Sequence, residues 1–183
     1  INDDVNGGLK PKMPMPVGNC IGGGLHSSGA WRTKPDFQEF LLIPKEKSFG
    51  RAVTRNLKAY EYARTLLKAT QKSWLIQRND EGAWRTSLAN EEVLEIMKKV
   101  AKKYGLRIGM DVAASSFYKK GYYRYSNKEL IRDKVDEIDY IGKLIRKFGI
   151  FYLEDGLHEE DFGGFKAVLD ATKKGRKKSL IVG

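Results

Sequence analysis

Two acidic residues stand where buried strands are expected to end. Asp111 closes the apolar run at 108–110, and Glu154 closes the run at 150–153. In parallel α/β proteins the carboxyl ends of the strands meet at one edge of the sheet, and ligands bind there. The two carboxylates are therefore expected to converge, although they lie far apart in the sequence.

Carboxylates that crowd together repel one another unless a cation lies between them. Cys20 is the single cysteine and the chain has two histidines, so oxygen ligands dominate. Such ligands favour a hard ion, and Mg²⁺ would keep water and substrate oxygens in its remaining positions. Acids after strands also cap turns or the helices that follow. Position alone leaves both interpretations open.

Apolar periodicity predicts alternating strands and helices around these acids. We expect strands at 17–21, 37–43, 107–113, 150–154 and 179–182. We expect helices at 48–71 with Ser48 as cap, 90–104 with Asn90 as cap, 126–149 from the capping box Ser126-x-x-Glu129, and 160–173. Phe49, Leu57, Ile131, Val135 and Phe162 are expected on buried helix faces.

This alternation predicts an α/β fold with a parallel sheet, either open and doubly wound or part of a barrel. The first two strands are an irregular opening because they look antiparallel. Residues 1–16, rich in Gly and Pro, are interpreted as a linker, and 17–183 as one domain.

The chain has 183 residues and a formal net charge of +11, which favours anionic partners. The run from Lys173 to Lys178 suits nucleic-acid binding, but also simple solubility or a hot habitat. A lone cysteine predicts a reducing, cytoplasmic location. With no apolar run near ~20 residues and no secretory start, no membrane partner is expected.

Five short motifs resemble the signatures of enolases, in enolase order. They are Gly22-Gly23-Gly24-Leu25-His26, Phe37-Gln38-Glu39-Phe40, Asn79-Asp80-Glu81-Gly82, Met110-Asp111-Val112-Ala113-Ala114-Ser115 and Leu153-Glu154-Asp155. The resemblance runs from about Pro14 to Gly183 and looks closest to archaeal enolases. It implies part of the C-terminal TIM-like barrel domain, and reversible dehydration of 2-phosphoglycerate to phosphoenolpyruvate in glycolysis and gluconeogenesis with Mg²⁺.

The resemblance also implies roles for individual acids. Asp111 and Glu154 match two of the three carboxylates that hold the first Mg²⁺. Glu81 matches the general acid, which protonates the departing hydroxyl. Glu39 matches a second, supporting glutamate near that hydroxyl and the substrate.

Two further side chains match substrate-binding positions. Gln38 matches a glutamine beside the substrate, and His26 matches a loop histidine near the phosphate. The glycines before His26 would let the loop close over substrate and exclude water. From these residues alone, a plain flexible turn is the other interpretation.

The third metal carboxylate, the catalytic lysine and the N-terminal domain of enolases have no counterpart in this sequence. We therefore expect this chain to be inactive alone, and the full-length protein to be a homodimer or higher homo-oligomer. Gly156 stands where enolases usually have proline. One alternative is a non-catalytic enolase-like protein with a basic surface that binds nucleic acid or other anions. Another is a relative that acts on a different carboxylate substrate.

Overall fold

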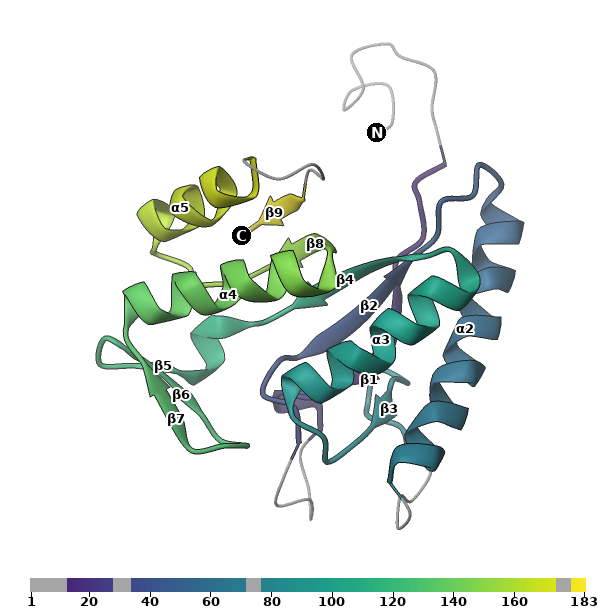
Figure 1. Ribbon diagram of the computed structural model, residues 1–183, viewed down its shortest axis with the longest axis horizontal. Helices are drawn as coiled ribbons and strands as arrows, with labels where there is room; N and C mark the ends of the chain where they lie inside the picture. The colour runs from purple at the N-terminus through teal and green to yellow at the C-terminus, as the bar shows by residue number, and fades with distance from the viewer. Residues whose placement is uncertain (1–12, 28–33, 72–76, 174–178) are drawn as a thin grey trace.

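The computed structural model describes residues 13–27, 34–71, 77–173 and 179–183. Its main sheet has six strands in the order β3-β1-β2-β4-β8-β9 (Figure 1). These strands are β1 (Gly18–Gly22), β2 (Glu39–Ile43), β3 (Trp84–Arg85), β4 (Arg107–Asp111), β8 (Ile150–Glu154) and β9 (Leu180–Val182).

The strand directions combine an antiparallel opening with a parallel continuation. Strand β2 runs antiparallel to both β1 and β4, whereas β4, β8 and β9 run parallel to one another. The predicted irregular opening and parallel sheet are thus confirmed. Among the described residues the sheet is open, with β3 and β9 at its edges, and it forms no closed barrel.

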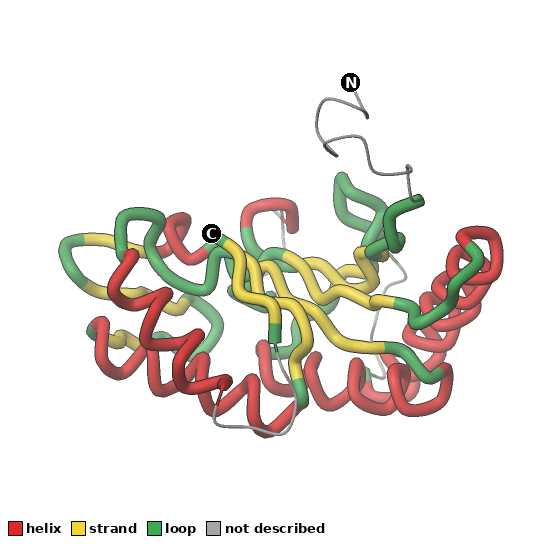
Figure 2. Tube along the Cα trace, turned by 90° about the horizontal axis from the view of Figure 1, so that it is seen from above, coloured by secondary structure: helices red, strands yellow, loops and turns green. Residues whose placement is uncertain are grey.

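Four helices lie along one face of this sheet (Figure 2). They are α2 (Phe49–Thr70), α3 (Asn90–Tyr104), α4 (Lys134–Phe148) and α5 (Phe162–Lys173). Phe40, Leu42, Ile108, Met110 and Leu153 belong to the buried core that includes residues of α2, α3 and α4. Because side chains alternate between the two faces of a strand, Glu39, Asp111 and Glu154 belong to the face away from the helices.

Small residues line the buried side of α2. Ala52, Ala59, Ala63 and Leu67 are buried, whereas Leu57 is 61% exposed and Phe49 is also exposed. Burial was therefore wrongly predicted for Phe49 and Leu57. Alanine side chains allow the helix to approach the sheet closely, so the larger apolar residues on the other side stay outside the contact. Ser48 occupies the predicted N-cap position but makes no side-chain capping bond.

Helix α3 follows the predicted range, but Asn90 is its first residue and Ala89 is its N-cap. Prediction of Asn90 as the cap was wrong. Its Oδ1 instead accepts hydrogen bonds from the backbone N–H groups of Asp36 at 2.9 Å and Phe37 at 3.2 Å. Asn90 thus holds the segment that leads into β2, while Glu92 accepts from the Ala89 N–H at 2.8 Å.

Helix α4 begins eight residues later than the predicted capping box, because the intervening chain forms strands. The second sheet consists of β5 (Tyr118–Lys119), β6 (Tyr122–Tyr125) and β7 (Leu130–Arg132). Asp133 is the N-cap and accepts from the Asp136 N–H at 2.9 Å. The capping box was a wrong prediction, as was the burial of Ile131 and Val135, both of which are exposed.

Helix α5 confirms the last predicted helix, although Phe162 is 77% exposed and does not pack against the core as predicted. The helix buries Val168. Most of the basic run, at 174–178, lies outside the described residues. None of the described helices has the length and apolar character needed to cross a membrane.

Candidate functional site

Three carboxylates share one row across neighbouring strands of the main sheet. Glu39 of β2 is the register partner of Asp111 of β4, and Asp111 is the register partner of Glu154 of β8. Glu39 begins an antiparallel strand, so it lies at the edge where β4 and β8 end. Paired residues point to the same face, and adjacent strands are about 4.8 Å apart. The predicted convergence of Asp111 and Glu154 is therefore observed.

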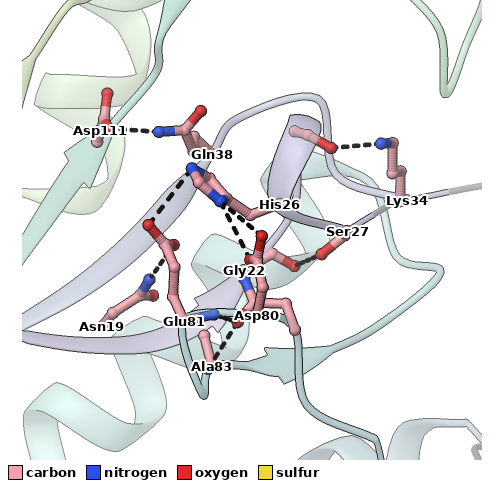
Figure 3. Close-up of polar contacts among 12 residues, drawn as sticks. Asn19, Gly22, His26, Ser27, Lys34, Gln38, Asp80, Glu81, Ala83 and Asp111 are labelled. Carbon is pink, nitrogen blue, oxygen red and sulfur yellow. Dashed lines mark hydrogen bonds and ion pairs between the residues drawn. The ribbon is translucent and has the colours of Figure 1, made fainter. Parts of the chain in front are cut away.

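Asp111 lies at the centre of this row and is buried. Its Oδ1 accepts from the Ala113 N–H at 2.9 Å, and its Oδ2 accepts from the Gln38 side-chain amide at 3.3 Å (Figure 3). Burial raises the pKa of Asp111 to about 6, the Ala113 N–H opposes the rise, and the negative charge of Glu154 adds to it. The environment therefore disfavours a bare negative charge at Asp111.

Glu154 is half-buried and held by its neighbour on the same strand face. The Tyr152 hydroxyl donates to its Oε2 at 2.9 Å. The backbone continues this link between the strand ends, because the Val112 N–H donates to the Glu154 carbonyl at 3.0 Å. Burial raises the pKa of Tyr152 to about 12, and the hydrogen bond to Glu154 adds to the effect. Tyr152 therefore remains a hydrogen-bond donor to this carboxylate near neutral pH.

A compact turn delivers Glu81 to the same region. Asn79 Oδ1 accepts from the backbone N–H groups of Glu81 at 3.1 Å and Ala83 at 2.8 Å, a side-chain bond typical of asparagine in turns. Gly82 has a φ of 79°, which favours glycine, and the Tyr60 hydroxyl donates to its carbonyl at 2.7 Å. The turn is thus fixed from within and from α2.

The Glu81 carboxyl group is contacted from β1 and from the loop after it (Figure 3). Asn19 Nδ2 donates to Oε2 at 3.0 Å, and His26 Nε2 lies 3.3 Å from Oε1. Burial raises the pKa of Glu39 to about 7, and the charge of Glu81 and a side-chain hydrogen bond between the two glutamates add to the rise. Glu39 and Glu81 therefore form an interacting pair beside the carboxylate row.

His26 lies between two carboxylates of the Glu81 turn. Its Nδ1 is 3.1 Å from Asp80 Oδ1, opposite the side on which Nε2 meets Glu81. The hydrogen bond with Asp80 is the main cause that raises the pKa of His26, and the charges of Glu81 and Asp80 add to it. The ring of His26 is partly exposed, and the acids around it favour its protonated form, which is suited to an anionic ligand group.

The glycines before His26 are required by close packing. A Cβ on Gly23 would lie 2.4 Å from the Pro35 carbonyl oxygen and 2.5 Å from the Phe37 carbonyl oxygen. Gly24 has a φ of 50°, in the region that favours glycine. These contacts explain why glycine occupies both positions, and the explanation requires no movement of the loop. Closure of the loop over a substrate stays a prediction. Residues 28–33 of the same loop lie outside the described part.

All six predicted site residues thus lie in one region, but sequence reasoning missed three of their partners. Asn19 contacts Glu81, Asp80 contacts His26, and Tyr152 contacts Glu154. Tyr152 could have been found, because it lies two residues before Glu154 on an alternating strand and so shares its face. Asn19 and Asp80 carried no comparable signal, since their partners come from distant segments.

The donor set of the row fits a divalent cation. Asp111 and Glu154 offer oxygen atoms from neighbouring register positions, and neither is neutralised by a lysine or arginine in the described ion pairs. Burial is the main cause of the raised pKa of Asp111, and the uncompensated charge of Glu154 adds to it. Hard cations bind such oxygen sets. His26, Asp80 and Glu81 form a second group whose ligand atoms lie within 4.8 Å of one another.

An α/β sheet with acids at the carboxyl ends of its parallel strands defines the class of proteins that bind ligands at this edge of the sheet. Residues 10–183 match the sequence model of a family described as "Enolase, C-terminal TIM barrel domain". The chain belongs to the enolase family. The resemblance and the fold class expected from the motifs are thereby confirmed.

Curated relatives agree with this assignment. The chain is 37% identical to an enolase of Picrophilus torridus over 97% of its length and 44% of the relative. It is 34% identical to an enolase of Pyrobaculum aerophilum, over 98% and 43%, and 36% identical to one of Methanosphaera stadtmanae, over 97% and 44%. The chain thus spans less than half the length of the curated relatives that it matches.

Proposed function

We propose that the protein to which these residues belong catalyses the reversible dehydration of 2-phosphoglycerate to phosphoenolpyruvate with Mg²⁺. The carboxylate row of Glu39, Asp111 and Glu154 is the observation that carries this proposal, because it gathers oxygen ligands beside a candidate proton donor. Enolase relatives support the substrate. Since the chain spans less than half of those relatives, the activity is proposed for the intact protein.

In this proposal Asp111 and Glu154 hold the cation. Two protein carboxylates leave room for substrate oxygens and for a further ligand from outside these residues. Once bound, Mg²⁺ would supply positive charge that stabilises the negative charge developing on the substrate carboxylate. Gln38 and Tyr152 orient the two ligands, because each donates a hydrogen bond to one of them.

Glu81 acts as the general acid. The reaction removes a proton from the carbon next to the carboxylate, and the hydroxyl on the next carbon leaves as water after it receives a proton. Glu81 donates that proton and Glu39 tunes it, which is supported by their interaction and by the Asn19 bond that fixes Glu81. The family resemblance assigns proton removal to a lysine that lies outside these 183 residues.

His26 and Gln38 bind substrate. The acids that flank His26 favour its protonated form, so the ring attracts the substrate phosphate and adds positive charge to an acidic site. Gln38 has one amide hydrogen engaged by Asp111 and lies beside the carboxylate row. A cytoplasmic location and a homo-oligomeric state remain part of the proposal.

The proposal is tested by assaying the intact protein with 2-phosphoglycerate and following phosphoenolpyruvate by its ultraviolet absorbance. We expect turnover with Mg²⁺, loss of turnover with a chelator, and recovery when Mg²⁺ is restored. Asp111→Asn should lower turnover, whereas Glu160→Gln, a change at an exposed acid outside the row, should not. Absence of turnover in the intact protein at saturating Mg²⁺ would refute the catalytic assignment.

A further inference from the structure

A basic groove lies at the edge of the sheet opposite the carboxylate row. Two hollows of about 600 Å³ and about 780 Å³ share Lys102 and Gly105 in their walls, so they adjoin one another, and together they are called the basic groove. Their walls come from the start of α2, the ends of α3 and α4, and the starts of β4 and β8. The cations that define the groove are Lys45, Arg51, Arg55, Lys58, Lys98, Lys102, Lys103 and Arg107.

The charge of this groove is nearly uncompensated. No aspartate or glutamate is among the residues that line the two hollows. Glu46, which lies beside them, pairs with Arg55 at 2.5 Å and with Arg51 at 3.9 Å. Within the described residues, Lys58 and Lys102 make no ion pair, and both are exposed. The groove therefore keeps several cations available to an external ligand.

Helix dipoles do not account for so many cations. The groove receives the C-terminal ends of α3, capped by Gly105, and of α4, capped by Gly149. Each end carries about half a unit of negative charge, so two ends balance about one cation. The first turn of α2 holds no acid, contains Arg51, and contributes partial positive charge of its own. The fold itself does not neutralise this concentration of positive charge. The groove is therefore suited to an anionic ligand.

The shape of the groove favours a chain of phosphates. The two adjoining hollows hold eight cations, more than a single phosphate group can contact. A polymer with many phosphates can contact several of these cations along its length. A flexible single strand can follow the walls of both hollows, whereas a duplex is stiff over this length and stays nearly straight. The rings of Tyr104 and Phe151 belong to the lining but are contacted by Lys103 and Arg107 of the same groove, so contacts of the cations with phosphates carry the binding.

We propose that this basic groove binds single-stranded nucleic acid through its phosphate backbone. The groove is independent of the proposed catalytic site, because β2, β4 and β8 separate the two. Strand β2 begins at Glu39, in the carboxylate row, and Lys45 of the groove follows its other end. Strand β4 begins at Arg107, in the groove, and ends at Asp111, in the row. Five-residue strands set the two edges about 13 Å apart along the sheet. Binding and turnover can therefore succeed or fail separately.

The test uses the intact protein and a fluorescein-labelled oligouridylate of about 16 nucleotides, followed by fluorescence anisotropy. With about four phosphates contacted, the slope of log affinity against log salt should be near −3, or about 50-fold between 50 and 200 mM salt. The double variant Lys58→Glu/Lys102→Glu should bind at least tenfold more weakly. Its turnover of 2-phosphoglycerate should equal that of the wild type.

The matched control is Lys119→Glu/Lys128→Glu, which changes the net charge equally. Lys119 belongs to β5 and Lys128 to the turn between β6 and β7, and this second sheet lies at the other end of the molecule (Figure 1). The affinity of this control variant for the oligouridylate should fall by less than about threefold. Equal losses of affinity in the two variants would show that the groove is not the binding surface. Undetectable binding of the oligouridylate at low salt would also overturn the proposal. Equal affinity for a duplex of the same length would overturn the single-strand assignment. If the reversed variant unfolds, Lys58→Gln/Lys102→Gln gives the same comparison with a smaller charge change.

Discussion

Asp111 and Glu154 are direct register partners on the parallel strands β4 and β8, and both stand at the carboxyl ends of those strands. Because partners share a face and neighbouring strands lie about 4.8 Å apart, one cation can meet both carboxylates without any change of the backbone. The antiparallel strand β2 brings Glu39 to the same edge from the opposite direction. The sheet therefore assembles the row before any ligand arrives.

Replacing Asp111 with asparagine should weaken Mg²⁺ binding at least tenfold. The amide keeps the size of the side chain but removes the negative charge at the centre of the row, where burial and Glu154 already raise the pKa of the acid to about 6. Calorimetric titration of the intact protein with Mg²⁺ measures the change. Glu159→Gln, an exposed acid outside the row, serves as control. An unchanged affinity in Asp111→Asn would remove Asp111 from the ligand set.

Replacing Gly23 with alanine should lower the free energy of unfolding by about 1–3 kcal/mol, because the new Cβ would press on two carbonyl oxygens at 2.4 and 2.5 Å. Gly50→Ala is the matched control, since nothing lies within 4 Å of a Cβ there and alanine favours the helix. Urea unfolding compares the two variants. Equal stability of Gly23→Ala and the wild type would show that the loop can yield, contrary to the close-packing interpretation.

Ionisation of the buried Glu137 carboxyl group should lower the free energy of unfolding as the pH rises towards 7. Burial raises its pKa to about 7 against an ordinary 4.5, while the Tyr125 hydroxyl, which donates to it at 2.5 Å, and Arg132 oppose the rise. The folded state therefore holds the proton more tightly than the unfolded state. Protonation of Glu137 contributes about 2–3 kcal/mol to the free energy of unfolding. This stabilisation is fully present below pH ~4.5 and is lost by pH ~7.

Urea unfolding at several pH values tests this prediction with Glu137→Gln, which keeps the acceptor for Tyr125 but cannot ionise. The wild type should lose stability between pH ~4.5 and pH ~7 relative to this variant, by about 2–3 kcal/mol. Asp139→Asn, an exposed change on the same helix, should keep the slope of the wild type. Parallel pH profiles for the wild type and Glu137→Gln would contradict the raised pKa.

Much of this architecture could be predicted because apolar runs are local. Strand β8 matches its predicted range, and the pattern of β4 located Asp111 at a strand end. Helix α4 shows why other predictions failed. The spacing of Ser126 and Glu129 imitates a capping box, but Tyr123 and Tyr125 alternate with exposed residues and form a strand. The period of two outweighed the local capping signal.

The site could be predicted only in part, for a related reason. Single motifs such as Asn79-Asp80-Glu81-Gly82 look like ordinary polar turns, and only their order across the chain connected them with a family. The contacts of Asn19 with Glu81 and of His26 with Asp80 join segments more than fifty residues apart. No local pattern encodes such pairs. The basic groove was equally hidden, because its cations come from four separate segments.

The most direct test of the catalytic account is the turnover of Glu81→Gln in the intact protein with Mg²⁺, measured together with its affinity for 2-phosphoglycerate. Glutamine keeps the shape of the side chain held by Asn19 and His26 but has no proton of suitable acidity to give. We expect turnover to fall by about 10²–10⁴-fold while substrate affinity changes little. Turnover near the wild-type rate would show that Glu81 is not the general acid and would contradict the proposed site.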